Sequence, residues 1–491
     1  MIKRNRNEFD PSAHVSPDDK WYDNFHRMKQ RPFYLVICPK SVGPVWVKHV
    51  EMSNEGNVEL YPHQKNVLTK IVGRMFYLLN WGMGSGKTLA ALAIMKLLNQ
   101  ECRVLNLIGM SKTQKIKALD NATAIVKPLV VVINYESAWR PGIKERIEKI
   151  KWSTIVYDEI QKLKSPTGKA SKFFGKMAEK HPNALRLGLS GTPLANSPLD
   201  AFGVFRSLAP GIFGRSWTKF RSRYAFMNPR VHGMILRLIN QDELSSLVME
   251  HCSRVRTEDV VELPPVRHQT IPIELSPAER KAYKEMQDDM VLELPDDNTV
   301  IPNNALSQLL RLGQMTGGFI GGVDVPGGIV RVGTGKPDKL AALIDYCDSL
   351  DENEPLVVVC RFRADLDSVG QITSRPIYEL SGRKNELDRW QRDEKGSVLA
   401  VQIQAGATGI DLTRASNCIF YSIGYSLADY EQMLARTHRP GQTRPCLYTH
   451  LIATDTVDES VYQALKNKKT VIDAVIGDLR KHITTEGATK T

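Results

Sequence analysis

A glycine-rich segment has the residue types that bind a nucleotide phosphate. Residues 80–88 read Asn-Trp-Gly-Met-Gly-Ser-Gly-Lys-Thr and lie between an apolar run at 76–79 and a helical pattern at 89–98. A strand that turns through glycines into a helix presents backbone N–H groups and the positive end of the helix dipole to an anion. We expect Lys87 to contact the β- and γ-phosphates and Thr88 to contact Mg²⁺. The remaining residues expected to hold the nucleotide are Gly82, Gly84, Ser85 and Gly86.

The segment departs from the full phosphate-loop pattern at one position. The pattern G-x-x-x-x-G-K-S/T requires glycine where this chain has Trp81. The match is therefore to the shorter Gly-x-Gly-Lys-Thr form. That form predicts an NTPase and no more specific activity.

An acidic pair follows a later apolar run. Residues 154–157 are followed by Asp158-Glu159-Ile160-Gln161. Carboxylates at the C-terminal end of a parallel strand are placed to bind Mg²⁺ and to orient the attacking water of an NTPase. We expect Asp158 to bind the metal and Glu159 to orient the water. The alternative, a solvated Asp-Glu turn, is disfavoured by the glycine loop upstream.

The elements that position these residues alternate between apolar runs and helical stretches, which predicts parallel sheets covered on both faces. Strands are expected at 33–39, 76–79, 104–108, 129–133, 154–157 and 185–189. A proline pair at 264–265 predicts a boundary, and the second series has strands at 356–360, 377–380, 398–403, 418–421 and 446–452. We expect an α/β fold with helical insertions. Its parts are a segment 1–59 whose strand belongs to the first domain, an ATP-binding domain 60–262, a second domain 263–475 and a polar tail 476–491.

The second series of strands is accompanied by no glycine-lysine-threonine loop. We therefore expect the second domain to contact the nucleotide only from the side opposite the phosphate loop. Its candidates are Gly409 and Asp411, together with Arg436 and Arg439. The two arginines are three residues apart, which predicts one face of a helix, and guanidinium groups near a γ-phosphate stabilise transition-state charge. Without further context, a solvated face or a salt bridge is the more usual role of two such arginines.

Six motifs, taken in order, resemble those of the Swi/Snf family of helicase superfamily two. They are Tyr61-Pro62-His63-Gln64 and residues 82–88, 158–161, 189–196, 405–413 and 432–442. The Arg-Pro-Gly-Gln that closes the last motif is specific to this family among helicase-like ATPases. The resemblance implies two RecA-like domains with ATP in the cleft between them and DNA bound across them.

The resemblance also implies roles for individual residues. Gln64 would contact the adenine, Arg436 and Arg439 would act as arginine fingers, and Ser190, Thr192 and Gln432 would couple the domains. Contacts to the sugar-phosphate backbone carry no sequence information, so DNA binding would be sequence-independent and salt-sensitive. The candidate DNA contacts at strand ends are Lys40, Ser41, Asn134, Tyr135, Ser381, Gly382 and Thr408.

Three features depart from the family pattern. Gln161 stands where many members have histidine, and no accessory module is visible, as in bacterial and phage members. The segment 36–42 with Trp46 resembles the first DNA-contacting motif but precedes the phosphate loop instead of following it. We expect that this strand has moved in the sequence while keeping its place in the sheet. The alternative is that the run at 104–108 fills that place.

Composition limits the remaining possibilities. The chain has 66 Lys and Arg against 54 Asp and Glu, a net charge of +12, as expected of a protein that meets phosphate backbones, although many basic proteins bind no nucleic acid. Its seven cysteines include no C-x-x-C pair, which argues against a zinc site and a disulfide framework. No apolar run is long enough to span a membrane and no secretory signal is present, so we expect a cytoplasmic protein of a bacterial or phage-infected cell with no membrane partner.

The sequence therefore predicts an ATP- and Mg²⁺-dependent motor that moves on double-stranded DNA. Two alternatives stay open. A strand-separating or branch-migration helicase would share every motif. A catalytically silent DNA-binding scaffold is disfavoured, because it has no reason to retain Lys87, Asp158, Glu159 and the two arginines.

Overall fold

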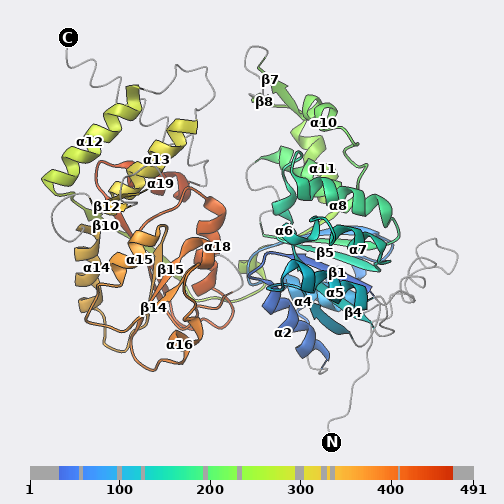
Figure 1. Ribbon diagram of the computed structural model, residues 1–491, viewed down its shortest axis with the longest axis horizontal. Helices are drawn as coiled ribbons and strands as arrows, with labels where there is room; N and C mark the ends of the chain where they lie inside the picture. The colour runs from blue at the N-terminus through green and yellow to red at the C-terminus, as the bar shows by residue number, and fades with distance from the viewer. Residues whose placement is uncertain are drawn as a thin grey trace, which may run out of the picture. The chain divides into compact units, whose positions relative to one another are not determined.

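The structure is a computed structural model that describes residues 33–54, 59–96, 102–122, 128–191, 197–228, 235–292, 303–321, 329–331, 338–406 and 410–467. These residues form two compact units (Figure 1). The first contains the described residues up to Asn228 together with Ile235–Val261, and the second begins at Glu262. The expected tail at 476–491 and the first 32 residues lie outside the described ranges.

The first unit is built on a seven-stranded parallel sheet with the order β3-β4-β1-β5-β6-β2-β9. Its strands are β1 (Phe33–Cys38), β2 (Phe76–Trp81), β3 (Arg103–Asn106), β4 (Leu129–Asn134), β5 (Thr154–Asp158), β6 (Leu185–Ser190) and β9 (Cys252–Val255). Every strand expected for this unit is present. Strand β9, which reads Cys-Ser-Arg-Val, was not predicted because it contains no apolar run.

Strand β1 lies inside this sheet, although it precedes the phosphate loop in the sequence. Val36 pairs with Val132 of β4 on one side and with Val156 of β5 on the other. Strand β3, which forms from the run at 104–108, lies at the sheet edge and pairs only with β4. The N-terminal strand therefore holds the central place that we expected, and the alternative that 104–108 fills it is wrong.

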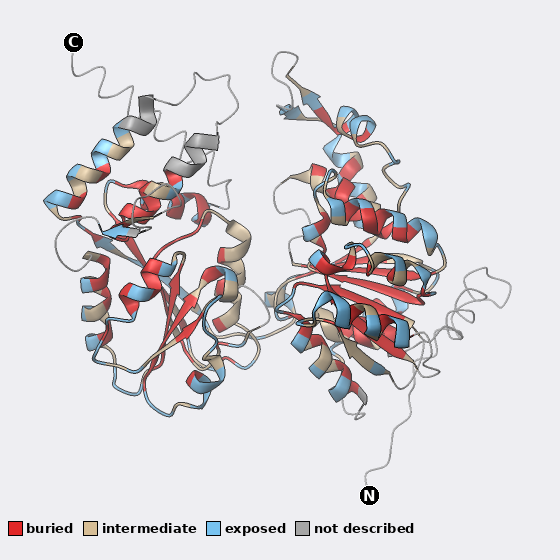
Figure 2. Cartoon of the chain, viewed as in Figure 1, coloured by how far each residue is buried: buried red, intermediate tan, exposed pale blue. Residues whose placement is uncertain are grey.

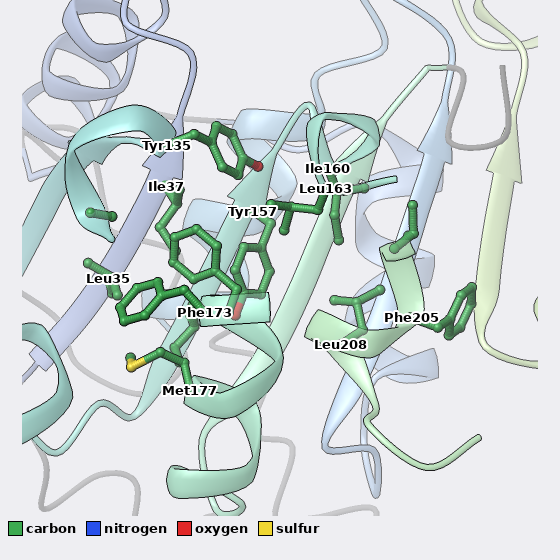
Figure 3. Packing of buried hydrophobic residues seen from close by; sticks show 14 of the residues in the cluster. Leu35, Ile37, Tyr135, Tyr157, Ile160, Leu163, Phe173, Met177, Phe205 and Leu208 are labelled. Atoms are coloured by element: carbon green, nitrogen blue, oxygen red, sulfur yellow. The ribbon is translucent and has the colours of Figure 1, made fainter. Parts of the chain in front are cut away.

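Helices cover both faces of this sheet, because successive strand residues point in opposite directions. Leu35 and Ile37 of β1 face one core, and Tyr34 and Val36 face the other. Figure 3 shows the first core, where Leu35, Ile37 and Tyr157 pack with residues of α8. Its helices are α5 (Lys112–Ala122), α6 (Tyr135–Ala138), α7 (Lys144–Lys149), α8 (Lys169–Lys180) and α9 (Ala201–Leu208); those of the second core are α2 (Gly43–Asn54), α3 (Pro62–Lys70) and α4 (Lys87–Lys96).

An extension of the first unit follows α9. It consists of α10 (Trp217–Tyr224), β7 (Ala225–Met227), β8 (Ile235–Leu238) and α11 (Gln241–Glu250). Strands β7 and β8 form an antiparallel hairpin, which Figure 1 shows beyond α10 on the side away from the seven-stranded sheet. Short 3-10 helices occur at Ile160–Leu163, Pro198–Asp200 and Thr257–Asp259.

The second unit contains a six-stranded parallel sheet with the order β10-β17-β16-β13-β15-β14. The strands are β10 (Val266–Ile273), β13 (Leu356–Cys360), β14 (Ile377–Leu380), β15 (Val398–Gln402), β16 (Asn417–Phe420) and β17 (Cys446–Ala453). Strand β10 was not predicted, because polar residues interrupt it and the boundary was placed just before it. A separate antiparallel pair is formed by β11 (Phe319–Gly321) and β12 (Ile329–Arg331).

Helices also cover both faces of the second sheet. Val357 and Val359 face one core, and Val358 and Cys360 face the other. The helices are α12 (Pro277–Leu292), α13 (Asn303–Met315), α14 (Asp338–Ser349), α15 (Arg363–Val369), α16 (Leu387–Arg392), α17 (Ile403–Gly406), α18 (Leu427–Thr437) and α19 (Val457–Lys466). Figure 2 shows that the central strands of both sheets are largely buried. The expected fold of two tandem RecA-like units is confirmed. In the described ranges, no helix has the length and apolar character needed to cross a membrane.

Candidate functional site

The glycine loop joins the end of β2 to the start of α4, as expected. Gly84 and Gly86 have φ angles of 77° and 78°, a left-handed conformation that favours glycine. The Lys87 ammonium donates to the backbone carbonyls of Trp81 at 2.9 Å and Gly82 at 3.0 Å. The lysine is thus folded over the loop at the N-terminus of α4, where backbone N–H groups and the helix dipole favour a phosphate.

Trp81 explains the departure from the full phosphate-loop pattern. It is the last residue of β2, fully buried, and its indole N–H donates to the Ser253 hydroxyl of β9 at 3.0 Å. The next residue, Gly82, donates its backbone N–H to the Val255 carbonyl at 2.8 Å. The strand therefore continues through Trp81, and its end is fixed to β9, a strand that was not predicted.

Gln64 supports the loop from α3. Its side chain is fully buried, donates to the Gly86 carbonyl at 3.0 Å and accepts from the Tyr61 backbone N–H at 2.8 Å. A Cβ atom on Gly86 would lie 2.2 Å from the Gln64 amide nitrogen, so this contact requires glycine. The ring of Tyr61 is 47% exposed and stacks on His63. Tyr61 is therefore the more accessible of these two side chains, and the expected contact between Gln64 and the adenine stays a prediction.

Asp158 ends strand β5 as a buried carboxylate with a partner from the N-terminal segment. The indole N–H of Trp46, on α2, donates to Asp158 Oδ2 at 2.8 Å. Burial is the main cause that raises the pKa of Asp158, and the negative charge of Glu159 acts in the same direction. The Trp46 hydrogen bond and the positive charge of Lys87 oppose this rise. The Trp46 hydrogen bond and the Lys87 charge therefore both favour the ionised carboxylate, which is the form that can bind a metal.

Glu159 is held in an unusual conformation beside Asp158. Its φ and ψ are 54° and 53°, a left-handed conformation that is uncommon for residues other than glycine and is often found at functional sites. The Gln161 amide donates to the Glu159 carboxylate at 2.5 Å, and Gln161 accepts from the Ser190 hydroxyl at 2.7 Å. Gln161, which stands where many members of the resembled family have histidine, therefore connects the end of β6 to the Glu159 carboxylate.

The two arginines of the second unit lie at the end of α18 and beyond it. Arg436 is in the last turn, but α18 ends at Thr437, so the expectation that both arginines lie on one face of a helix is wrong. The chain leaves the helix before Pro440-Gly441, and Gly441 has a φ angle of 103°. Arg439 donates from Nη1 to the Ile410 carbonyl at 2.9 Å.

The segment 410–415 packs against this helix end. Leu412 donates its backbone N–H to the Arg436 carbonyl at 3.0 Å. The buried Gln442 amide donates to the carbonyls of Thr413 at 3.1 Å and Ala415 at 2.9 Å. The Asp411 carboxylate accepts from the Thr413 N–H and hydroxyl. These hydrogen bonds hold the end of the motif at 405–413 against the motif at 432–442 within the second unit.

The candidate DNA contacts divide into exposed and buried residues. Lys40 and Ser41 follow β1 directly and are exposed, as expected of residues that reach a backbone. Asn134 and Tyr135 are 7% and 3% exposed. The Asn134 amide donates to Glu136, and the Tyr135 hydroxyl donates to the Asp158 carbonyl at 2.8 Å. The side chains of this pair are therefore turned inward, toward Glu136 and the end of β5, and are not exposed as we expected of DNA contacts.

The remaining predicted residues follow the second sheet or lie outside the described ranges. Ser381 follows β14, and its hydroxyl donates to Glu379 at 2.5 Å, while the Gly382 N–H lies 3.5 Å from the Gln402 amide oxygen. Gln432 is on α18 and partly exposed. Thr192, Thr408 and Gly409 lie outside the residues that the structure describes.

Trp46 is the buried partner of Asp158 that sequence reasoning missed. It was noted only as part of a displaced motif, and no periodicity could connect it with Asp158, 112 residues away. The sequence signal that could have placed Trp46 near Asp158 is the strand that precedes it, which was expected at the centre of the sheet. A strand beside β5 brings its following helix over the end of β5.

Two family models match the chain. A model of the SNF2-related domain matches residues 20–316, which is more than half of the 491 residues. A model of the helicase conserved C-terminal domain matches residues 336–441.

Individual relatives are distant. The DNA annealing helicase and endonuclease ZRANB3 of Mus musculus is 24% identical over 439 residues, covering 82% of this chain and 39% of that protein. The uncharacterized ATP-dependent helicase YqhH of Bacillus subtilis is 24% identical over 460 residues, covering 85% of this chain and 80% of that protein. The chain thus spans about two fifths of the length of the first relative. The solved SWI2/SNF2 ATPase core of Sulfolobus solfataricus in complex with dsDNA is 21% identical, covering 86% of this chain and 93% of that chain, with a TM-score of 0.35.

Proposed function

The chain belongs to the SNF2 family of ATP-dependent helicases in helicase superfamily two, and from this membership we propose that it is a DNA-dependent ATPase that moves along duplex DNA without sequence specificity. The observation that supports this proposal best lies within the first unit. There the phosphate loop is fixed by hydrogen bonds to β2, β9 and α3. The Asp158 carboxylate accepts from Trp46 of α2, and the Glu159 carboxylate accepts from Gln161, which is bonded to the end of β6.

ATP is the proposed substrate, and its triphosphate would lie on the loop around Lys87. The left-handed Gly84 and Gly86 give the loop a shape in which its N–H groups can face an anion. The Thr88 hydroxyl and the Asp158 carboxylate would hold Mg²⁺, because Mg²⁺ is usually held by one or two protein oxygens together with phosphates and waters. When bound, Mg²⁺ would neutralise charge that develops on the phosphates.

Glu159 would orient the attacking water, and Gln161 would link that carboxylate to Ser190. Arg436 and Arg439 of the second unit would stabilise charge on the γ-phosphate in the transition state. Tyr61 would offer its exposed ring to the adenine. In this mechanism the two domains would correspond to residues 60–262, with the strand of 1–59 added, and to residues 263–475.

DNA would be bound through its sugar-phosphate backbone. Lys40 and Ser41 are the best-supported contacts, since both are exposed directly after the strand that pairs with β4 and β5. Ser381 and Gly382 are the corresponding candidates of the second unit. A backbone contact gives no sequence preference and makes affinity strongly dependent on salt.

The first experiment compares ATP turnover without DNA and with closed circular duplex, single-stranded and forked DNA. We expect closed circular duplex to stimulate turnover, because a motor that moves on intact duplex DNA does not require a free DNA end. We expect Glu159→Gln to bind a fluorescent ATP analogue normally and to lose turnover. Wild-type turnover in Glu159→Gln, or no stimulation by any DNA, would overturn the proposal.

A second experiment separates movement from strand separation. A motor that only moves on duplex DNA displaces a third strand from a triplex but does not release a labelled strand from a simple duplex. Release of the duplex strand would favour the strand-separating alternative.

The DNA contact is tested with Lys40→Ala. We expect a similar loss of affinity on any DNA sequence, with the salt slope reduced by ~1, and unchanged ATP binding without DNA. Lys48→Ala is the matched control, because Lys48 is also exposed but lies further along α2. Equal losses of DNA affinity in Lys40→Ala and Lys48→Ala would show that Lys40 makes no particular contact with the DNA backbone.

A further inference from the structure

The hairpin of β7 and β8 exposes apolar side chains that the proposed mechanism does not use. Phe226 is 51% exposed, Leu236 is 49% exposed and Ile235 is 40% exposed. Exposed apolar groups gathered on one short element often mark an interaction site. Figures 1 and 2 show the hairpin extending from α10 with exposed residues on its strands.

The base of the hairpin is firmly held, so this exposure is not that of a loose loop. Tyr224 and Ala225 are each 3% exposed, and the Tyr224 ring packs 4.8 Å from Phe220, which in turn lies 5.2 Å from Phe202. The Tyr224 hydroxyl donates to Glu243 of α11 at 2.7 Å. A hairpin fixed in this way can present a side chain to a ligand at little cost in conformational entropy.

The charge of this region indicates an anionic partner. From position 201 to 241 the sequence has no Asp or Glu. Its basic residues within the described ranges are Arg206, Arg215, Lys219, Arg221, Arg223 and Arg237. Helix α11 has Asp242 and Glu243 in its first turn, and Glu243 is engaged by Arg223 at 2.7 Å and by Tyr224. Arg215 pairs with Glu179 at 3.3 Å. A basic segment interleaved with aromatic residues suits the phosphates and bases of a nucleic acid.

Phe226 and Arg237 form a cross-strand pair at the centre of this surface. They are opposite each other in the hairpin register, and the Arg237 guanidinium lies 5.5 Å from the centre of the Phe226 ring. An aromatic ring stacks on a nucleobase of any type, and an adjacent arginine can contact the phosphate of the same strand. Bases inside a duplex are already stacked on their neighbours, so the ring can stack on an unpaired or terminal base without the cost of separating two stacked base pairs.

We propose that the β7–β8 hairpin binds an unpaired nucleotide of DNA, with Phe226 stacking on the base and Arg237 contacting the backbone. This inference rests on the proposed function as a DNA motor and specifies its preferred DNA. The hairpin gives the protein higher affinity for DNA with an unpaired strand, such as a fork, than for uniform duplex. Lys40 and the other backbone contacts do not provide this distinction, because they carry no information about base pairing.

The test measures affinity by fluorescence anisotropy for a uniform duplex and for a forked duplex with the same number of phosphates. Wild-type protein should bind the fork more tightly. Phe226→Ala should reduce that preference by about tenfold, because one stacked base is lost, while Phe226→Trp should retain it. Arg237→Gln should weaken binding to the fork and reduce its salt slope by ~1. Met249→Ala is the control, since Met249 is 48% exposed on α11 but outside the hairpin.

The outcomes separate this inference from the proposed function. If closed circular duplex stimulates wild-type turnover but Phe226→Ala keeps the full preference for the fork, the hairpin inference is overturned and the motor proposal stands. The hairpin inference is also overturned, and the motor proposal stands, if Phe226→Ala changes only the molar mass measured by light scattering. That result would make the hairpin a contact between copies of the chain. If no DNA stimulates turnover, the motor proposal fails. A loss of single-strand affinity in Phe226→Ala would then still support the hairpin site. Thermal unfolding of each variant checks that the fold is retained.

Discussion

The indole N–H of Trp46 donates a hydrogen bond of 2.8 Å to the carboxylate of Asp158, and both side chains are buried. The tryptophan belongs to a strand-helix segment that precedes the phosphate loop, whereas the carboxylate follows that loop by many residues. The sheet brings them together, because β1 is the direct neighbour of β5. A segment that looks like an N-terminal extension therefore supports the proposed metal ligand.

Trp46→Phe should weaken Mg²⁺-dependent ATP binding by about tenfold or more, since a hydrogen bond to a charged group contributes roughly 1.5–3 kcal/mol. Titration of a fluorescent ATP analogue at several Mg²⁺ concentrations measures this effect without turnover. Trp152→Phe is the matched control, because Trp152 is equally buried in the same unit and donates at 2.8 Å to the Ile147 carbonyl. Equal losses in both variants would show that only stability is affected.

The chain of hydrogen bonds from Ser190 through Gln161 to Glu159 can be tested as a unit. Gln161→Ala and Ser190→Ala should each lower DNA-stimulated turnover by about tenfold, and the double variant should lose little more than the more affected single variant, because residues in one network are coupled by roughly 0.5–3 kcal/mol. Ser153→Ala is the control, since the buried Ser153 hydroxyl bonds to the Phe33 carbonyl outside this chain. If the loss of turnover in the double variant equals the product of the two single losses, the three residues do not act as one chain of hydrogen bonds.

Local patterns predicted the parts of the site that depend on a few adjacent residues. The loop around Lys87 and the pair Asp158-Glu159 could be found because glycine spacing and a strand end determine their chemistry. The strands were predicted where apolar runs are continuous, as in Val130 to Ile133. The short, polar strand β9 was missed because its burial comes from its neighbour β2 and not from its own composition.

Long-range contacts could not be predicted from such patterns. Trp46 meets Asp158, and Trp81 meets Ser253, only because the sheet places distant segments side by side. Tyr135 illustrates the opposite error. Its position at a strand end predicted exposure, but its hydroxyl is directed inward to the Asp158 carbonyl. The parallel direction of the strands places their C-terminal ends at one edge of the sheet, whereas packing decides which side chains at that edge are exposed.

The central place of β1 predicts a large stability effect from a residue that precedes the phosphate loop in the sequence. Leu35→Ala should reduce the free energy of unfolding of the first unit by about 2–5 kcal/mol, because Leu35 is fully buried. Leu105→Ala on edge strand β3 should cost less, since Leu105 is only partly buried. Urea unfolding followed by circular dichroism compares the two. A larger loss for Leu105→Ala would contradict the observed strand order.

His450 should make the second unit sensitive to mild acid. Its ring is fully buried, Nε2 lies 2.9 Å from the Tyr430 hydroxyl, and the ring stacks on Phe420 at 4.8 Å. Burial lowers the pKa of His450 to about 4, and the nearby His268 contributes in the same direction, whereas the hydrogen bond to the Gln269 backbone opposes it. The folded state therefore favours the neutral ring.

A group whose pKa is lower in the folded state gives its full stability above the unfolded pKa, near 6.5, and loses it as the pH falls toward 4. We expect about 2 kcal/mol of this contribution to be lost at pH 5. His450→Gln should flatten the pH dependence of the free energy of unfolding between pH 7 and pH 5. An unchanged slope in that variant would assign the acid sensitivity to other groups.

Arg439 combines a structural contact with an unused donor. Its Nη1 bonds to the Ile410 carbonyl at 2.9 Å, while its buried Nε has no hydrogen-bond partner in the described part of the chain. A buried donor without a partner is costly, and an incoming phosphate would satisfy it. Arg439→Ala should therefore reduce the turnover number about 10³-fold or more, with little change in ATP affinity. Arg439→Lys should not restore turnover, because an ammonium lacks the planar set of donors. Arg444→Ala is the control, since Arg444 lies nearby in the sequence but pairs with Glu354 at 2.6 Å. A loss below tenfold in Arg439→Ala would leave this arginine with the single role of bracing the segment at Ile410.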